Sequence, residues 1–203
     1  MSVDRVVSLP DAGSLLIRPI SPDDGAALVE GFNRLSDQSR YRRFLSPHAR
    51  LSTAEVRYFT EVDHHDHEAL VALDPNTGTG VGVARYVRSA EDPHSAEIAI
   101  AVVDDLQRRG VGTRLASALA DRAREEGINV FTGLVLADNE LMLNLAGELG
   151  QVRVLHRERG TVEIAVELPE QGLGRLTRLL HAVAAGDLRP FIHHLVEAGA
   201  GGA

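Results

Sequence analysis

The sequence predicts one α/β (α+β) domain, with a mixed central sheet of about seven strands flanked by helices. Strand-like and helix-like segments follow one another in the order β, three helices, three consecutive strands, α, β, α, β, β. One strand, 96–103, is almost wholly apolar, which is typical of a strand covered on both faces. A glycine-containing loop at 107–112 joins that strand to an amphipathic helix. Together these observations indicate a sheet with a ligand-binding turn at one strand end.

Composition restricts the classes of function. The chain has 203 residues, of which 44% are apolar and 25% charged, enough for one globular domain with its own core. A formal charge of −8 offers no basic surface for nucleic acid and favours cationic partners. Cysteine is absent, which excludes disulfides, thiolate metal sites and cysteine nucleophiles. Residues 1–10 lack the apolar core of a signal peptide and no stretch is long enough to span a membrane, so we expect a cytoplasmic protein.

The first third of the chain predicts a strand and three helices. Ser14 to Ile20 has strand character, and Ser21, followed by proline, is a typical N-cap for a helix that runs to about Leu35. A second short helix is expected over 39–45. A capping box that starts at Ser52 begins a third helix.

The rest of the domain alternates strands, turns rich in glycine, proline and aspartate, and two further helices. Strands are expected at 69–73, 81–87, 96–103, 130–136, 152–155 and 161–168, and helices at 113–126 and 139–149. The domain therefore covers 13–168. Residues 173–197 carry two apolar helical stripes and predict an amphipathic C-terminal extension, which packs on the domain or forms a homodimer contact.

The loop Gln107-Arg108-Arg109-Gly110-Val111-Gly112, followed by Thr113, predicts an anion site. Glycines let the backbone turn tightly and approach a ligand, and the first amides of the next helix have no intrahelical acceptor. The positive end of the helix dipole then suits a phosphate or pyrophosphate. A plain turn is the alternative. The loop matches neither the P-loop nor the dinucleotide-binding pattern.

In this order of elements, the loop resembles the signature of the GNAT acyl-CoA N-acetyltransferases, over roughly 13–168. The segments Leu15 to Ile20, Leu35 to Phe44 and Ala96 to Ala99 resemble the catalytic domain of bacterial Pat-type protein lysine acetyltransferases. The resemblance implies a GNAT fold with a splayed sheet, acetyl-CoA as cosubstrate and an acceptor amine. That acceptor is a protein lysine or, alternatively, a small amine or polyamine. A non-catalytic acyl-CoA-binding module is a third interpretation.

The resemblance also implies which residues bind the cofactor. The pyrophosphate would lie on Gln107, Arg108, Arg109, Gly110, Val111, Gly112 and Thr113. Unpaired backbone groups of Val102 and Val103 would pair with the pantetheine, in the gap before the strand at 130–136. Asn139 would help to hold the pantetheine or the adenosine side, or would simply cap the following helix, and Asn144 is a weaker candidate.

Glu97 is the candidate catalytic residue because it is the only charge in an otherwise apolar strand. A carboxylate buried among apolar side chains holds a proton more readily than one in water. An acceptor lysine arrives protonated and must lose a proton before it attacks, and the resemblance implies a glutamate on this strand as general base. The alternative is a solvated carboxylate at the strand start, or one paired with Arg85.

Other features restrict the chemistry. Residues 138–156 contain no tyrosine, although many members of the superfamily use one there as general acid, so the acid is unassigned. No Gly-x-Ser-x-Gly elbow is present, which favours direct attack of the amine on the thioester over a covalent enzyme intermediate.

Two polar segments have competing interpretations. The cluster from Asp63 to Glu68 contains imidazoles and carboxylates but lacks His-Glu-x-x-His spacing, so a loop that lines the substrate mouth is favoured over a metal site. No metal is therefore expected. Arg40 to Phe44 predicts a polar helix that covers the active-site entrance and not a nucleic-acid patch, given the net charge.

Overall fold

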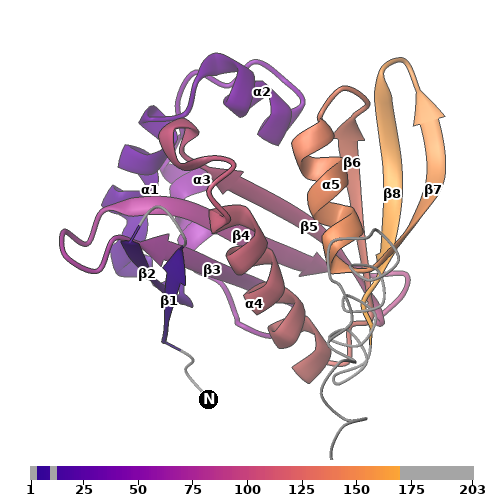
Figure 1. The fold of residues 1–203 in the computed structure, drawn as a ribbon, viewed down its shortest axis with the longest axis horizontal. Helices are drawn as coiled ribbons and strands as arrows, with labels where there is room; N and C mark the ends of the chain where they lie inside the picture. The colour runs from indigo at the N-terminus through magenta and orange to yellow at the C-terminus, as the bar shows by residue number, and fades with distance from the viewer. Residues whose placement is uncertain (1–3, 10–12, 170–203) are drawn as a thin grey trace, which may run out of the picture. The chain divides into compact units, whose positions relative to one another are not determined.

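The computed structural model describes residues 4–9 and 13–169, which form an eight-stranded sheet with helices on both faces (Figure 1). The strands lie in the order β1-β2-β3-β4-β5-β6-β8-β7. They are β1 (Arg5–Leu9), β2 (Gly13–Pro19), β3 (His67–Leu73), β4 (Gly80–Arg88), β5 (Ser95–Val102), β6 (Val130–Leu136), β7 (Gln151–Glu158) and β8 (Thr161–Glu167). The helices are η1 (Pro22–Asp24), α1 (Gly25–Asn33), α2 (Asp37–Phe44), α3 (Thr53–Thr60), η2 (Asp104–Leu106), α4 (Val111–Glu125) and α5 (Glu140–Leu149).

The helices divide between the two faces of the sheet. α4 and α5 pack side by side on one face, while α1 and α3 lie behind the sheet and α2 lies beside β5 (Figure 1). The larger hydrophobic core lies under α4 and α5, around Leu115, Leu119, Tyr86 and Phe131. A smaller core on the other face gathers around Ile20. Central strands such as β3 are buried on both sides, which explains their nearly continuous apolar sequence.

The predicted fold class is confirmed, with two corrections in the N-terminal part. Residues Arg5–Leu9 add a strand that pairs antiparallel with β2, so the sheet has eight strands instead of about seven. The helix expected from Ser21 begins as the 3₁₀ turn η1 and continues as α1. The predicted extension at 173–197, and with it the homodimer contact, lies outside the described residues.

The sheet opens between β5 and β6, as the resemblance implied. These parallel strands pair only over Ser95–Glu97 and Val130–Thr132, and no pair follows beyond Glu97. β6 instead continues along β8 up to Leu136, while β5 continues along β4 up to Val102. A wedge-shaped gap therefore separates the two halves of the sheet beside the predicted loop (Figure 1). Among the described helices, none is both long enough and apolar enough to cross a membrane.

Candidate active site

A cleft of about 700 Å³ occupies the gap between β5 and β6, a size in the range of small-molecule sites. It reaches both faces of the sheet. On the side of α4 and α5 its walls include Ile98, Val102 and Leu145, and on the side of α2 they include Arg43 and Glu97. A ligand in the cleft can thus be approached from both sides at once.

The direction of the backbone in β5 follows from its pairing with β4. Two hydrogen bonds, from Ser89 N to Ser95 O at 2.9 Å and from Val103 N to Val81 O at 3.0 Å, mark hydrogen-bonded pairs. Because such pairs alternate along an antiparallel ladder, even-numbered residues of β5 turn their backbone groups toward β6. Ile100 and Val102 lie beyond the last residues paired with β6. Their backbone groups therefore line the gap.

Val103 differs from the prediction because its backbone groups are not unpaired. Its N–H donates to the carbonyl oxygen of Val81, and its own carbonyl accepts from the N–H of Leu106 at 3.0 Å. The side chain is only 2% exposed. Because Val103 is odd-numbered, its backbone groups point toward β4. Ile100, not Val103, is therefore the second residue, with Val102, whose backbone groups face the gap.

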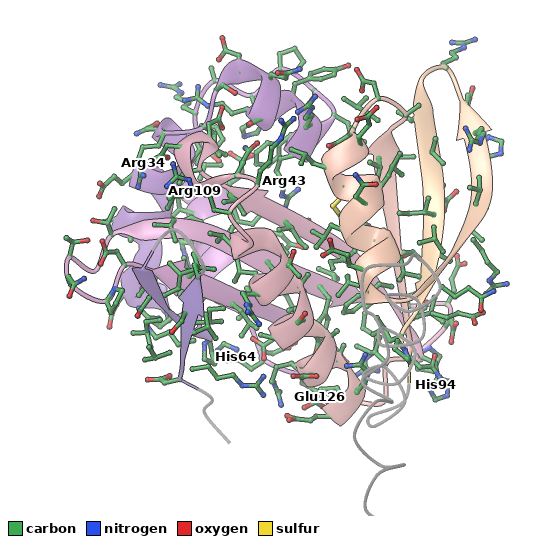
Figure 2. The ribbon with its side chains drawn as sticks, in the orientation of Figure 1. Arg34, Arg43, His64, His94, Arg109 and Glu126 are labelled. Atoms are coloured by element: carbon green, nitrogen blue, oxygen red, sulfur yellow. The ribbon has the colours of Figure 1, made fainter. Side chains whose placement is uncertain are left out.

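The loop before α4 presents free amides, as the sequence predicts for an anion site. Gly110 is the N-cap in the left-handed region with φ 85°, and Arg108 has φ 60°. The first helical bond runs from Arg114 N to Gly110 O at 3.0 Å. The amides of residues 108–113 have no acceptor in the described parts of the chain. Arg109 lies at this end of α4 (Figure 2), and Arg108, Arg109 and Arg114 form no ion pair with any described carboxylate.

Gly112 faces the cleft and is not required by protein packing. A Cβ at this position would meet Leu145 Cδ2 at 3.7 Å and Val102 Cγ2 at 3.8 Å, which are ordinary van der Waals contacts. The backbone there is helical, so φ does not demand glycine either. The space that a methyl group would fill belongs to the cleft, which fits a site built for close approach of a ligand to the backbone.

Gln107 uses its side chain inside the protein. Its Nε2 donates to the carbonyl of Val102 at 3.0 Å and to Ser39 Oγ at 3.1 Å, with Asp104 Oδ1 at 3.3 Å. Gln107 thus joins the loop, the end of β5 and α2. Contact of the Gln107 side chain with a pyrophosphate stays a prediction, and its amide donors already have these partners.

Asn139 caps α5, which was one of its two predicted roles. Its Oδ1 accepts from Met142 N at 3.4 Å, and the residue also lines the cleft. Both roles are compatible because its Nδ2 donor has no acceptor among the described residues. Asn144 lines the same cleft from the next turn of α5.

Glu97 lies at the fork of the sheet, in register with Val87 of β4 and Thr132 of β6. The prediction that its carboxylate is buried is wrong: the side chain is exposed on the wall of the cleft that faces α2. The divergence of β6 removes the neighbour that would cover it. Glu97 forms no hydrogen bond or ion pair with the described residues, and Arg85 is bonded elsewhere.

Two arginines lie beside Glu97: Arg85, which the sequence suggested only as a possible partner of that carboxylate, and Arg43, which belongs to the polar helix expected at 40–44. Arg85, on β4, is 5% exposed, donates to the Phe59 carbonyl at 3.1 Å, contacts His67 Nε2 at 3.1 Å and stacks on the Phe59 ring. Burial, with the charge of Arg43 nearby, lowers the pKa of Arg85 to about 9. A charge at an inward position of the strand at 81–87 was the signal that could have identified it.

The histidine cluster does not line the cleft, which corrects that prediction. Glu68 is 1% exposed and accepts from Arg122 Nε at 3.2 Å and from His64 Nδ1 at 2.7 Å. His65 bonds Glu126, so the cluster fastens the C-terminal end of α4 to β3 (Figure 2). The reason is that Glu68 points to the α4 face of the sheet. No group of three metal-ligating side chains gathers within residues 4–9 and 13–169.

Comparison with known proteins agrees with this geometry. The family described as "Acetyltransferase (GNAT) domain" matches residues 14–152. The acetyltransferase Pat of Mycolicibacterium smegmatis is 35% identical over 153 residues, which are 75% of this chain but 45% of that protein. An acetyltransferase of Pseudomonas aeruginosa is 33% identical over 72% of this chain and 80% of its own length. The crystal structure of the GNAT domain of S. lividans PAT superimposes with a TM-score of 0.75 at 34% identity, covering 81% of this chain and 97% of that domain.

Fold, cleft and sequence similarity together define a class of protein. The chain belongs to the GNAT acetyltransferase domain family, a class of N-acyltransferase enzymes. More narrowly, its sequence is similar to acetyltransferases of the Pat type. It spans less than half the length of the mycobacterial relative.

Proposed function

We propose that this protein is an acetyl-CoA-dependent N-acetyltransferase that acetylates a lysine of another protein. The observation that carries the proposal is the cleft through the sheet, with free amides on one side and an unpartnered carboxylate on the other. The absence of cysteine and the acidic composition fit a cytoplasmic protein.

The residues of the cleft fit acetyl-CoA. The amides of 108–113 and the unpaired charge of Arg108, which lines the cleft, suit a pyrophosphate; Arg109 lies at the same helix start but not in the wall of the cleft. The backbone groups of Ile100 and the N–H of Val102 offer strand-like hydrogen bonds to the amides of a pantetheine arm, whereas the carbonyl of Val102 already accepts from Gln107 Nε2 at 3.0 Å. Gly112 leaves room for that arm to lie against the helix start. The thioester would then lie near the fork of the sheet.

Glu97 is the proposed general base because it stands at that fork on the acceptor side. Its carboxylate takes one proton from the lysine ammonium, directly or through water, and leaves the nitrogen lone pair free. The nitrogen forms a bond to the thioester carbonyl carbon, and the carbon–sulfur bond breaks. The nitrogen loses its second proton as it becomes an amide. The sulfur leaves as a thiolate, which needs no strong acid because thiols ionise readily, and this second proton goes to the departing thiolate, directly or through water, to give the free thiol.

Removal of the base tests this assignment. Glu97→Gln should lower kcat by about 10²-fold or more, the range of general base catalysis, with little change in acetyl-CoA affinity. Glu163→Gln is the matched control, since Glu163 is an exposed glutamate on β8 that does not line the cleft. Initial rates from thiol release and acetyl-CoA titration by calorimetry measure the two quantities. Unchanged kcat in Glu97→Gln would reject Glu97 as the base.

A small amine is the second candidate acceptor, because acceptor choice depends on loops that vary on one fold. The similarity to Pat-type proteins and the net charge of −8 both favour a lysine-bearing protein surface. Thiol release should be faster with a lysine-rich protein than with polyamines and free amino acids at equal amine concentration. The reverse order would support the small-amine enzyme. Tight acetyl-CoA binding without release on any acceptor would indicate a non-catalytic module.

A further inference from the structure

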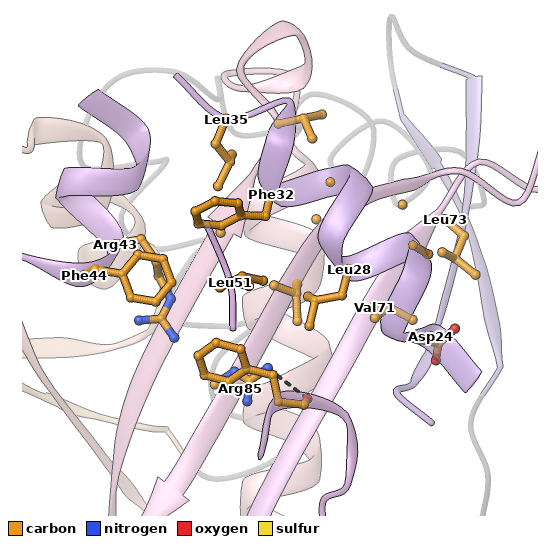
Figure 3. A pocket seen from close by; sticks show the side chains of 18 residues that line it. Asp24, Leu28, Phe32, Leu35, Arg43, Phe44, Leu51, Val71, Leu73 and Arg85 are labelled. Atoms are coloured by element: carbon orange, nitrogen blue, oxygen red, sulfur yellow. Dashed lines mark hydrogen bonds between the residues drawn. The ribbon is translucent and has the colours of Figure 1, made fainter. Parts of the chain in front are cut away.

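A small apolar pocket lies beside the cleft, on the face of the sheet that carries α1, α2 and α3. Its volume is about 70 Å³, and Phe32, Phe44 and Phe59 contribute to its walls (Figure 3). Arg43 and Arg85 stand at one end of it, with Asp24 at the other. Arg43 is the residue of interest here, because it also lines the cleft that contains Glu97.

The guanidinium of Arg43 has no anionic or hydrogen-bonding partner within the described residues. It forms a cation–π interaction with the neighbouring Phe44, 4.9 Å from the ring centroid. Asp24 cannot neutralise it, since Arg18 bonds both carboxylate oxygens of Asp24 at 2.6 and 2.8 Å. Arg43 is partly exposed and lines the cleft, and its five N–H donors have no acceptor among the described residues, so the guanidinium is available to a ligand there.

The charges around Arg43 leave an excess of positive charge. Arg85 is a buried cation close enough for the charge of Arg43 to act on it, and its partners are a neutral carbonyl, an aromatic ring and a histidine. Burial lowers the pKa of Arg43, and the attraction of Glu97 opposes that shift. Glu97 attracts Arg43, as Tyr58 does more weakly, but no ion pair within 4.0 Å joins Arg43 and Glu97. On the side of the cleft that faces α2, the two cations Arg43 and Arg85 thus lie near one carboxylate, that of Glu97.

This arrangement is complementary to a ligand with both charges. An ammonium group belongs beside Glu97 and a carboxylate beside Arg43, because each finds there the opposite charge at a position open to the cleft. Arginine presents a planar pair of N–H groups that matches a carboxylate. A purely cationic acceptor would be attracted by Glu97 but repelled by Arg43 and Arg85.

We propose that Arg43 binds a carboxylate of the acceptor close to the amine that is acetylated, so that the preferred acceptor is a lysine with a neighbouring carboxylate. The inference rests on the proposed function and names the chemistry of its acceptor. Arg43 would contact the carboxylate and so determine acceptor specificity. Arg85 would add a second positive charge to the same wall of the cleft. The same chemistry could come from the carboxylate of a dicarboxylic acyl group, which the test below distinguishes.

The test compares two acceptors that differ in one charge. Nα-acetyl-lysine and its methylamide carry the same side-chain amine, but only the first has a free carboxylate. With acetyl-CoA, the parent enzyme should show kcat/KM about tenfold higher for the carboxylate form, as one charged hydrogen-bonded contact provides. In Arg43→Gln the ratio should fall to about twofold or less, and in Arg43→Lys it should partly recover. Circular dichroism establishes that each variant is folded.

Arg57→Gln is the matched control, because Arg57 is exposed on α3 and pairs with Glu61 of the same helix at 3.1 Å. It should keep the parental ratio. Equal use of both acceptors by the parent enzyme, or an unchanged ratio in Arg43→Gln, would overturn the proposal. An Arg43-dependent preference for succinyl-CoA over acetyl-CoA with the methylamide would reject the acceptor as the source of the carboxylate. If the parent enzyme transferred acetyl groups to no amine at all, the proposed function itself would fail.

Discussion

Two glycines of the loop, Gly110 and Gly112, have different reasons to be glycine. Gly110 adopts φ 85°, a conformation that costs an L-residue about 1 to 2 kcal/mol. Gly112 is helical and has room for a methyl group, but that room is part of the cleft. One glycine therefore serves the backbone and the other serves the ligand.

Alanine at each position should separate these roles. Gly110→Ala should lower the free energy of unfolding by about 1 to 2 kcal/mol, because the left-handed conformation is retained at a cost. Gly112→Ala should leave the free energy of unfolding unchanged or slightly higher, yet weaken acetyl-CoA binding by about tenfold, since the methyl group enters the cleft. Urea unfolding and calorimetric titration measure the two effects. Parental acetyl-CoA affinity in Gly112→Ala would place the cofactor away from this helix start.

Residue identity was easier to predict than residue environment. Glu97 could be selected as the lone charge of an apolar strand, but its exposure depends on where β6 diverges, which no local pattern encodes. Likewise, Val102 and Val103 look alike in sequence. The parity of the ladder with β4 makes one face the gap and the other face its neighbour. Such parity is fixed by register between distant strands.

At the scale of elements, the contact between β2 and η1 depends on one buried acid. Asp24 is 7% exposed and accepts from Arg18 and from Ser21 N at 2.7 Å. Burial alone would raise the pKa of Asp24, but the hydrogen bonds from Arg18 and Ser21 outweigh it and hold the pKa below its usual value. Asp24 therefore stabilises the fold in its ionised form.

The sign of this effect predicts how stability depends on pH. Because the pKa of Asp24 is lower in the folded protein than in the unfolded chain, its contribution to stability is fully present above the unfolded-state pKa of about 3.9. That contribution is lost as the pH falls through the pKa of the folded state. Asp24→Asn should lower the free energy of unfolding by roughly 1 to 3 kcal/mol between pH 5 and 7, the range for hydrogen bonds to a charged group. The difference from the parent protein should shrink below about pH 4. Urea unfolding across this range measures it.

Asp23→Asn provides the control, because Asp23 is its exposed neighbour in the same 3₁₀ turn. It should remain within about 0.5 kcal/mol of the parent at every pH. A difference for Asp24→Asn that persists unchanged at low pH would show that packing of the side chain matters and its charge does not.

Local signals predicted the elements well where they were strong. Ser52 and Glu55 form the expected capping box, with Glu55 N to Ser52 Oγ at 3.2 Å and Ser52 N to Glu55 Oε2 at 2.7 Å. The strand at 130–136 was predicted with its observed bounds. β1 was missed because five residues at a sheet edge have little apolar burial to reveal them.

At the scale of the whole molecule, the functional feature is the incomplete pairing of two parallel strands. It places the loop of α4 on one face and Glu97 with Arg43 on the other, with a continuous cleft between them. No segment of the sequence encodes this opening by itself. The resemblance to a known family implied it, whereas composition, periodicity and motifs gave only the elements on either side.

An open path through the sheet predicts that both substrates are bound together when the acyl group is transferred. The described walls of the cleft contain no cysteine. Of their hydroxyls, Ser39 accepts a hydrogen bond from Gln107 and Thr113 donates to Glu148 at 3.0 Å, and neither is bonded to a histidine that could activate it. Double-reciprocal plots at several fixed acceptor concentrations should therefore intersect, as for a sequential mechanism. Intact-protein mass spectrometry after incubation with acetyl-CoA alone should show no acetylated side chain in the cleft. Parallel plots together with a chemically competent acetyl-enzyme would contradict direct transfer, and with it the assignment of Glu97 as the base that acts on the incoming amine.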